Sequence, residues 1–345
     1  MKISKTKLEQ LSYNILKECN VPQDDAQIIV NSILYAHTRG KGTHGVGRMP
    51  IYVRKIKEGL MSSETELTLV KDSPVVSTFD ANHGFGQVAA HRGMEYALDK
   101  ADKNGVGVVG IKNSNSFGTA GFILELAAKR QMIGLMFSNA SPAIAPSGGS
   151  KPLFGTNPIG FVFPNQMGEP PIVLDMATSV AARSKIRMAA ANGEPIPLGW
   201  ALDSNGNPTT NPIEALKGSM VAIGEHKGYG LSLAVDILAG LLTGAAFGGD
   251  VKPLNHKDSN SNYGHCIIAI NISFFMDISD YFKKIKYLIR KTKECGKSGE
   301  VYLPGEQSFN NAKCSSNIVN ITTKQIEDLN NLLDTLEIKG RLEIN

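Results

Sequence analysis

The sequence is poor in cysteine and in long apolar runs, and each shortage excludes a class of protein. Four cysteines are spread over 345 residues without a CxxC pair, so neither a zinc knuckle nor a disulfide framework is predicted and a reducing compartment is expected. No segment approaches the about 18 consecutive apolar residues of a membrane helix. The opening MKISKTKLEQL lacks the apolar run of about 7 to 15 residues that marks a secretory signal. We therefore expect a cytoplasmic protein that does not associate with a membrane.

An excess of one charge is also missing. The chain has 36 Lys and Arg against 32 Asp and Glu, a formal net charge of +4, and no block of like charges. The most basic stretch, residues 283–297, is interrupted by apolar residues at helical spacing, which is typical of a solvated helix face. Nucleic acid is therefore not an expected partner. The seven histidines are scattered, without HxxxH or HExxH, so no metal site is predicted.

The pattern of apolar residues predicts an α/β or α+β fold. The first 60 residues are mostly helical, with a capping box at Thr6–Glu9, and residues 65–79 alternate like strands. Further strands are predicted at 105–111, 132–137, 161–163, 172–174 and 265–270, and helices at 90–101, 120–129, 229–242, 281–292 and 324–336. The helices at the two ends of the chain are expected to pack around this core as one discontinuous domain.

A short glycine motif lies between a predicted strand and a predicted helix. Gly84-Phe85-Gly86-Gln87-Val88-Ala89 fits the GxGxxA pattern of a Rossmann dinucleotide site. However, the next strand ends in Ile111-Lys112, without the acid that would bind the ribose hydroxyls. A simple turn is therefore favoured, and a Rossmann-type binding protein is kept as an alternative.

Seven longer strings occur in order and carry more information than the glycine motif. They are THGVGR (43–48), NSNSFGTAG (113–121), GTNPIGF (155–161), LDMATS (174–179), PIPLGWALDSNGNPTT (195–210), HKGYGL (226–231) and LPGE (303–306). Together they closely resemble the type-2 malate/L-lactate dehydrogenases, whose relatives include ureidoglycolate, sulfolactate, diketogulonate and piperideine-carboxylate oxidoreductases. The resemblance covers nearly the whole chain.

This resemblance implies a non-Rossmann fold and an enzyme. Residues 1–70 with 250–345 would form a helical, substrate and dimerisation domain, and residues 71–249 a mixed-sheet NAD(P)-binding domain. The implied protein is a homodimer that uses NAD, with NADP open, to reduce a small 2-oxo acid to a 2-hydroxy acid. Malate dehydrogenase or L-lactate dehydrogenase activity is the leading expectation.

The candidate substrate residues lie in and just after THGVGR. His44, Arg48 and Tyr52 are four residues apart and would share one face if the segment were helical, although Gly45 and Gly47 indicate a loop that leads into a helix. Arg48 can bind a carboxylate with two hydrogen bonds, and the ordinary pKa of His44 suits proton donation near neutrality. By themselves these residues would suggest only an exposed helix entry, but the resemblance places them at the substrate.

Position 116 departs from the family pattern. Relatives usually have histidine there as the acid/base that faces the substrate oxygen, whereas this chain has Ser116, whose hydroxyl titrates far too high to replace imidazole. Three outcomes follow: His44 carries the proton with Asp175 as its orienting partner, the enzyme is slow, or activity is lost. The last gives the alternative function, an impaired relative that binds dinucleotide or oxo acid as a sensor.

The candidate cofactor residues are spread along the chain. Gly224-Glu225-His226-Lys227-Gly228 leads into a predicted helix, so backbone N–H groups and the Lys227 ammonium could bind a phosphate. The resemblance adds Ala140, the segment Asp175-Met176-Ala177 and the turn Pro304-Gly305-Glu306. The substrate and the choice between NAD and NADP are left open, because neither pocket can be read from these strings.

Overall fold

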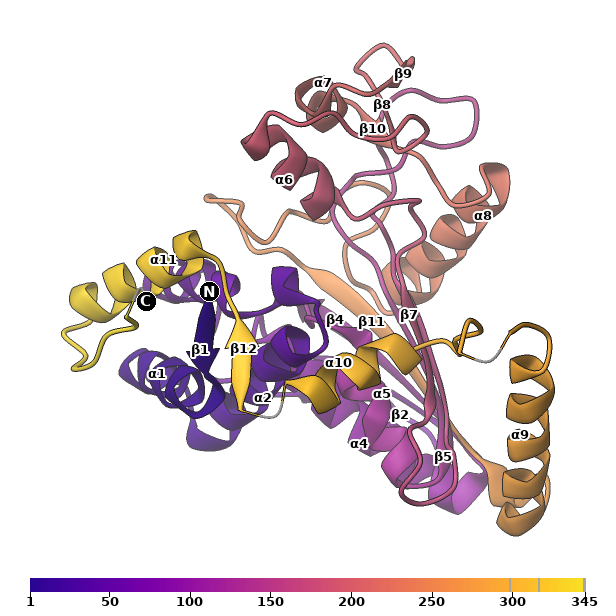
Figure 1. The fold of residues 1–345 in the computed structure, drawn as a ribbon. Coiled ribbons are helices and arrows are strands. Elements are labelled where there is room, and N and C mark those ends of the chain that lie inside the picture. Colours follow the sequence, from indigo (N-terminus) through magenta and orange to yellow (C-terminus); the bar gives the residue numbers. More distant parts are fainter. Residues whose placement is uncertain (298, 316, 344–345) are drawn as a thin grey trace.

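A seven-stranded mixed sheet forms the centre of the protein (Figure 1). The structure is a computed structural model that describes residues 1–297, 299–315 and 317–343. Its strand order is β2-β3-β4-β11-β5-β6-β7. The strands are β2 (Thr68–Asp72), β3 (Val76–Asp80), β4 (Val106–Ser114), β5 (Met132–Ser138), β6 (Ile159–Phe163), β7 (Ile172–Met176) and β11 (Tyr263–Asn271). β3 and β4 pair in parallel, and the other neighbours are antiparallel. The expected mixed-sheet α/β fold is confirmed, and it is not an all-parallel Rossmann sheet.

Strand β11 comes from the C-terminal third of the chain but lies in the middle of the sheet, between β4 and β5. Its run Tyr263–Asn271 is buried on both faces along most of its length, which matches its nearly continuous apolar sequence. A domain boundary at residue 250 would therefore separate β11 from the sheet that it completes. The division of the chain into two domains stays a proposal, with β11 assigned to the sheet.

Helices cover the two faces of the sheet unequally. α4 (Gly86–Asn104) and α5 (Ala120–Lys129) pack on one face. The other face is contacted by η3 (Asp236–Leu241), a π-helical turn that continues α8 (His226–Val235). α9 (Ile278–Lys293) lies at the end of the molecule (Figure 1), with Ile285 as its buried residue and its lysines mostly exposed, as the solvated-face interpretation expects.

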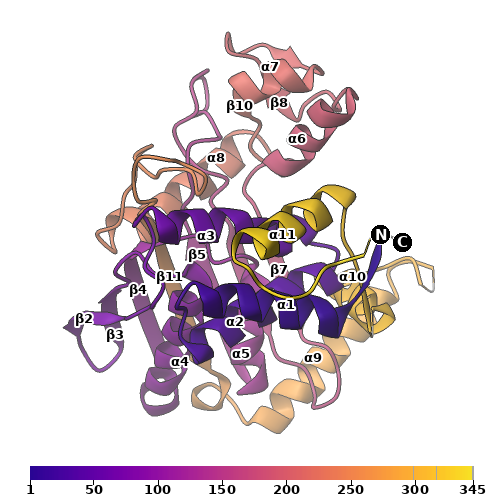
Figure 2. The same ribbon diagram turned by 90° about the vertical axis from the view of Figure 1, so that its left-hand side faces the viewer.

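Both ends of the chain meet in a helical layer beside α4 and α5 (Figure 2). β1 (Lys2–Ser4) pairs with β12 (Ile318–Asn320), and α1 (Lys5–Glu18), α2 (Gln23–Thr38), α3 (Met49–Lys57) and α11 (Thr323–Thr335) surround them. Their core joins residues such as Leu8, Ile15 and Ile33 to Leu329 and Leu333. The expected helical domain built from both chain ends is thus confirmed.

The expected capping box at Thr6–Glu9 is wrong. α1 begins at Lys5, and the Ser4 side chain caps it by accepting a hydrogen bond from the Lys7 backbone N–H. The helix begins earlier than expected because β1 ends at Ser4 and α1 follows it without a loop. A capping box does form at the start of α11, between Thr322 and Gln325.

A small lobe stands apart from the sheet at the top of Figure 1. It contains α6 (Arg183–Asn192), β8 (Ala201–Leu202), β9 (Pro208–Thr209), α7 (Pro212–Lys217) and β10 (Ser219–Met220). A separate core that includes Ile186, Ile196 and Met220 stabilises it. Among the described residues, none of the helices combines the length and apolarity needed to cross a bilayer.

Candidate active site

The THGVGR string folds into two short 3-10 turns followed by a helix. η1 spans Gly42–His44, η2 spans Val46–Arg48, and α3 starts at Met49. His44 and Arg48 therefore lie on separate turns, and the alternative of a loop leading into a helix is the one observed. We call residues 41–48, which include both side chains, the substrate arm.

The shape of the substrate arm depends on His37 at the end of α2. The His37 Nε2 atom accepts a hydrogen bond of 2.9 Å from the Val46 backbone N–H, so the ring proton sits on Nδ1, 3.3 Å from the Asn320 carbonyl oxygen. Burial lowers the pKa of His37 and keeps it neutral for this role. A Cβ atom on Gly45 would lie 2.3 Å from Nε2 of the same ring, so only glycine allows this close packing.

His44 is half-buried and is not charged at neutral pH. Burial first, and then the Arg48 and Lys41 cations, lower its pKa to about 4, and only the Asp175 carboxylate opposes this shift. The resting ring is therefore neutral rather than an ordinary imidazolium, and the role of His44 as proton donor stays a prediction. The main cause is burial of the ring, and the two nearby cations add to it.

Arg48 is positioned to bind an anion. Its Nε atom donates a hydrogen bond of 3.1 Å to the Thr43 carbonyl oxygen, which orients the guanidinium within the substrate arm. Among the described residues its two terminal nitrogens form no hydrogen bond or ion pair. They are the atoms that would bind a carboxylate with two parallel hydrogen bonds.

Tyr52 lies in the helical core, with only 2% of its surface exposed. Its hydroxyl oxygen accepts a hydrogen bond of 2.7 Å from Gln87 Nε2, and its ring packs edge-on against Phe85. Arg48 acts electrostatically on the hydroxyls of both Tyr52 and Tyr263, whose pKa values burial raises. Two buried phenols thus stand near the Arg48 guanidinium.

Ser116 is half-buried in the loop that follows β4. Beneath this loop, His265 of β11 lies 2.8 Å from Ser114 Oγ and 2.9 Å from Ser138 Oγ, and burial lowers its pKa to about 4. His265 therefore fixes the end of β4 as a neutral hydrogen-bonding group. The loop then continues into the start of α5.

The GxGxxA motif packs against this loop and does not bind a phosphate through its glycines. A Cβ atom on Gly86 would lie 2.0 Å from the Asn115 carbonyl oxygen, and one on Gly84 would lie 2.7 Å from Thr65. Protein atoms therefore fill the space that a Rossmann motif leaves for a pyrophosphate. The turn interpretation is the one that the geometry supports.

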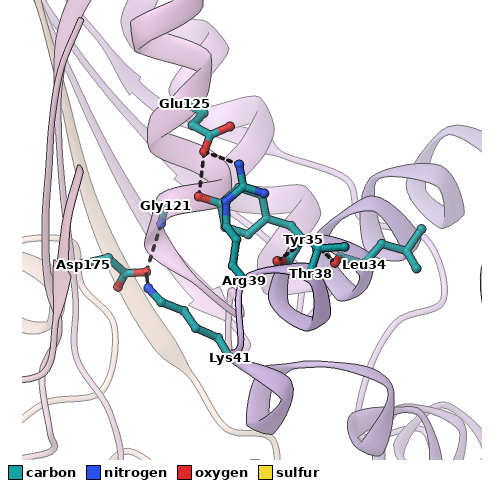
Figure 3. Close-up of polar contacts among 8 residues, drawn as sticks. All are labelled: Leu34, Tyr35, Thr38, Arg39, Lys41, Gly121, Glu125 and Asp175. Carbon is teal, nitrogen blue, oxygen red and sulfur yellow. Dashed lines mark hydrogen bonds and ion pairs between the residues drawn. The ribbon is translucent and has the colours of Figure 1, made fainter. Parts of the chain in front are cut away.

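Asp175, at the end of β7, is the point where the segments of the site meet (Figure 3). Its Oδ2 atom accepts a hydrogen bond of 2.6 Å from the Lys41 ammonium and one of 3.2 Å from the Gly121 backbone N–H. Lys41 belongs to the substrate arm, and Gly121 lies at the start of α5, just after the Ser116 loop. The partner of Asp175 is thus Lys41, and the expected orienting bond to His44 is not observed.

The cofactor candidates lie along β7 and beside the segment that follows it. The Val173 backbone N–H donates a hydrogen bond of 3.1 Å to the Pro304 carbonyl oxygen, and Ile223 N–H donates to Thr178 O. The first bond brings the turn Pro304-Gly305-Glu306 next to β7, and the second does so for the loop that ends at Lys227. Ala140 lies near them as well, because its N–H donates a hydrogen bond of 3.0 Å to Asn157 Oδ1. The carbonyl of the preceding residue, Thr156, accepts a hydrogen bond from the Thr178 N–H.

The cofactor candidates differ in exposure and in the partners they already have. Ala140, Met176 and Ala177 are half-buried and supply an apolar wall, whereas Lys227 is exposed in the first turn of α8. Glu306 is less available, because its carboxylate pairs with Lys293 at 2.5 Å and accepts from the Leu303 N–H, and the Lys293 ammonium lowers its pKa. Within the described ranges, no group of three or more His, Cys, Asp or Glu side chains could hold a metal ion.

Comparisons with known proteins agree with this geometry. The family model for malate/L-lactate dehydrogenase matches residues 3–330. The chain belongs to this family. The malate/(S)-sulfolactate dehydrogenase of Methanothermus fervidus is 38% identical over 340 residues, which cover 98% of this chain and 99% of that protein. The solved sulfolactate dehydrogenase of Methanocaldococcus jannaschii has a TM-score of 0.92 at 35% identity and covers 98% of both chains.

A relative with a different named substrate is similar over most of its length as well. The ureidoglycolate dehydrogenase (NAD(+)) of Escherichia coli is 34% identical over 310 residues, covering 89% of this chain and 88% of that protein. As a member of the malate/L-lactate dehydrogenase family, the chain is an oxidoreductase. The family alone does not single out one hydroxy acid.

Three residues of this dehydrogenase were missed in the sequence. Lys41 resembles any exposed loop lysine, His37 resembles an ordinary helix histidine, and Tyr263 stands at the start of a strand far along the chain. Their parts in the site depend on contacts with Asp175, Val46 and Arg48 that only the fold creates. The one available signal was the adjacency of Lys41 to the THGVGR string.

Proposed function

We propose that the protein reduces a small 2-oxo acid, oxaloacetate or pyruvate, to malate or L-lactate with NAD(P)H. The observation that carries the proposal is the position of Asp175, which joins the substrate arm to β7 just before the cofactor candidates Met176 and Ala177. The names of the relatives support an acid with a hydroxyl at carbon 2. A bound NAD(P)H would supply the hydride, and the chain supplies binding, orientation and the proton.

Arg48 binds the carboxylate of the oxo acid in this proposal, and His44 delivers the proton to the ketone oxygen. The proton becomes available only after the substrate binds, because the substrate carboxylate offsets the Arg48 charge that lowers the pKa of His44. Ser116 can hydrogen-bond the ketone oxygen but cannot act as the proton reservoir. Tyr52 and Tyr263 limit the space around the Arg48 guanidinium.

Lys227 binds a phosphate of the dinucleotide, and Ala140, Met176 and Ala177 contact its nicotinamide half. The start of α8 adds backbone N–H groups to the Lys227 charge. Relatives named for NAD and for NADP both exist, so either dinucleotide is a candidate. The Pro304-Gly305-Glu306 turn closes the same wall through its bond to β7.

A homodimer is proposed on the basis of one exposed apolar stripe. Leu231 on α8, Ile237 and Leu241 on η3 and Leu242 just after it are each more than two-fifths exposed. Large exposed apolar residues gathered along one segment are typical of an interaction site. Sedimentation of the natural protein, compared with a Leu241→Glu and Leu242→Glu double variant, measures whether this stripe joins two copies.

The alternative is a relative that has lost its turnover and binds dinucleotide or oxo acid as a sensor. Two observations favour it: position 116 is serine, and the pKa of His44 is about 4 in the free protein. Neither position therefore offers a charged imidazole before substrate binds. Binding without catalysis would be the result.

The test is to follow NADH and NADPH absorbance with oxaloacetate, pyruvate, sulfopyruvate and other 2-oxo acids, beside calorimetric titration of each dinucleotide. We expect turnover of at least one acid. The pH profile of kcat should fall at higher pH than that of kcat/KM, because only the complex has a raised His44 pKa. Dinucleotide binding without turnover of any acid would support the sensor instead.

A further inference from the structure

Two ion pairs join the end of α2 and the start of the substrate arm to the sheet unit (Figure 3). The Arg39 guanidinium lies 2.9 Å from Glu125 Oε1 on α5, and the Tyr35 hydroxyl donates to the same oxygen at 2.8 Å. Two residues further on, Lys41 Nζ lies 2.6 Å from Asp175 Oδ2 on β7. The first bridge therefore joins the helical layer to α5, which packs on the sheet, and the second joins it to the sheet itself.

The Lys41 bridge lies between the two halves of the site. Lys41 is followed directly by η1, which ends at His44, and Asp175 is followed directly by the cofactor candidates Met176 and Ala177. The Arg39 bridge lies further from these residues, and its guanidinium stacks 3.7 Å above the Tyr35 ring. The Lys41–Asp175 bridge thus holds the substrate arm against the strand that leads to the cofactor candidates Met176 and Ala177.

The bridge is partly removed from water, which makes the loss of one partner costly. The Lys41 side chain is 33% exposed and that of Asp175 is 13% exposed. Without Lys41, the carboxylate would keep only the longer bond from the Gly121 N–H and would leave a poorly solvated negative charge beside His44.

We propose that Lys41 is a positioning residue of this enzyme, which fixes the substrate arm to β7 and keeps the Asp175 carboxylate paired and away from His44. The kinetic part rests on the proposed function. The electrostatic part does not, because it concerns charges of the free protein. Lys41 has no role in this proposal as a group that touches substrate.

The electrostatic part predicts opposite changes in the pKa of His44 for two variants. The charged groups that act on His44 are Arg48 from η2, Lys41 from the substrate arm and Asp175 from β7. Lys41→Met removes a cation and frees the carboxylate, so the pKa of His44 should rise. Asp175→Asn removes the one group that raises it, so the pKa should fall.

The experiment is an NMR titration of full-length protein with ¹³C-labelled histidine, in which the His44 signal is assigned by its absence from His44→Asn. Lys41→Arg should titrate like the natural protein, and so should Lys17→Met, a control on the exposed face of α1. The proposal is overturned if Lys41→Met leaves the His44 pKa unchanged or if Asp175→Asn raises it. A Lys41→Gln variant replaces Lys41→Met if the latter does not fold.

The kinetic arm uses the oxo acid that the natural protein reduces best. Lys41→Met should lower kcat/KM at least about tenfold, since small displacements of a substrate-binding group can cost up to about 100-fold, while the Kd for NADH barely changes. Lys41→Arg should restore most of the loss. Unchanged kcat/KM in Lys41→Met overturns the positioning role. If the natural protein reduces no acid, the proposed function fails, and the titration still decides the electrostatic part.

Discussion

Lys55 allows the energy of a buried charge in this enzyme to be measured directly. It lies on α3, which begins just after Arg48, and its side chain has no exposed surface. Its ammonium donates a hydrogen bond of 2.8 Å to Ser261 Oγ. Burial, with a smaller effect of the nearby Arg54, lowers its pKa from the ordinary 10.5 to about 8.

The sign and the size of the effect follow from this shift. Between pH 8 and 10.5 the folded protein has released the Lys55 proton, whereas the unfolded chain still binds it. Stability therefore rises with pH across this window. Each pKa unit corresponds to about 1.4 kcal/mol, so the gain is roughly 3 kcal/mol. Below pH 8 the folded protein holds a buried cation and lacks this stability.

Lys55→Met keeps most of the side-chain volume and removes the charge. At pH 7 we expect a net gain of about 2 kcal/mol, because avoiding the buried charge contributes roughly 3 kcal/mol and losing the Ser261 bond costs about 1 kcal/mol. Urea unfolding from pH 7 to 10.5 would compare the natural protein, Lys55→Met and Lys57→Met, a control on the exposed side of the same helix. If the natural protein and Lys55→Met differ by the same amount at every pH, the reasoning is refuted.

Three further predictions concern the site. Arg48→Lys should raise KM for the oxo acid strongly with little change in dinucleotide affinity, since lysine keeps the charge but loses the paired hydrogen bonds; equal losses in both would contradict this role. Lys227→Ala should weaken dinucleotide binding measured by calorimetry without changing the unfolding midpoint, and unchanged affinity would exclude it from the site. Ser116→His should raise turnover, by as much as the about 10² to 10⁴-fold that general acid catalysis typically contributes. That gain should shrink if His44 already supplies the proton, in which case His44→Ala abolishes activity in the natural protein.

Much of the fold could be predicted because its signals are local. α5 begins and ends where its apolar spacing placed it, and the run around Ile267 that predicted a buried strand is β11. The place of β11 between β4 and β5 could not be predicted, because strand order depends on pairing between residues more than a hundred positions apart. The small lobe was missed because its strands are only two residues long.

The sequence motifs named several candidate residues of the site, but they did not predict how its charged groups pair or titrate. The resemblance gave Asp175 and Arg48 their places, yet the pairing of Asp175 with Lys41 and the low pKa of His44 arise from contacts across 134 positions of sequence and from burial. A pattern of residue types carries neither the distance between two charges nor their exposure to water. For that reason the sequence did not indicate that His44 is neutral before substrate binds.

Because the two chain ends pair, the substrate arm is synthesised long before two of its hydrogen-bond partners. His37 holds the substrate arm through Val46, but its other ring nitrogen relies on the carbonyl of Asn320, and Gln325 Nε2 reaches the Gly42 carbonyl. A ribosome makes these partners some 280 residues after the arm itself, at about 5 to 20 residues per second. All seven strands of the central sheet are therefore made before the two supports of the substrate arm. A chain that stops before residue 318 would lack both supports and also the α11 residues of the helical core.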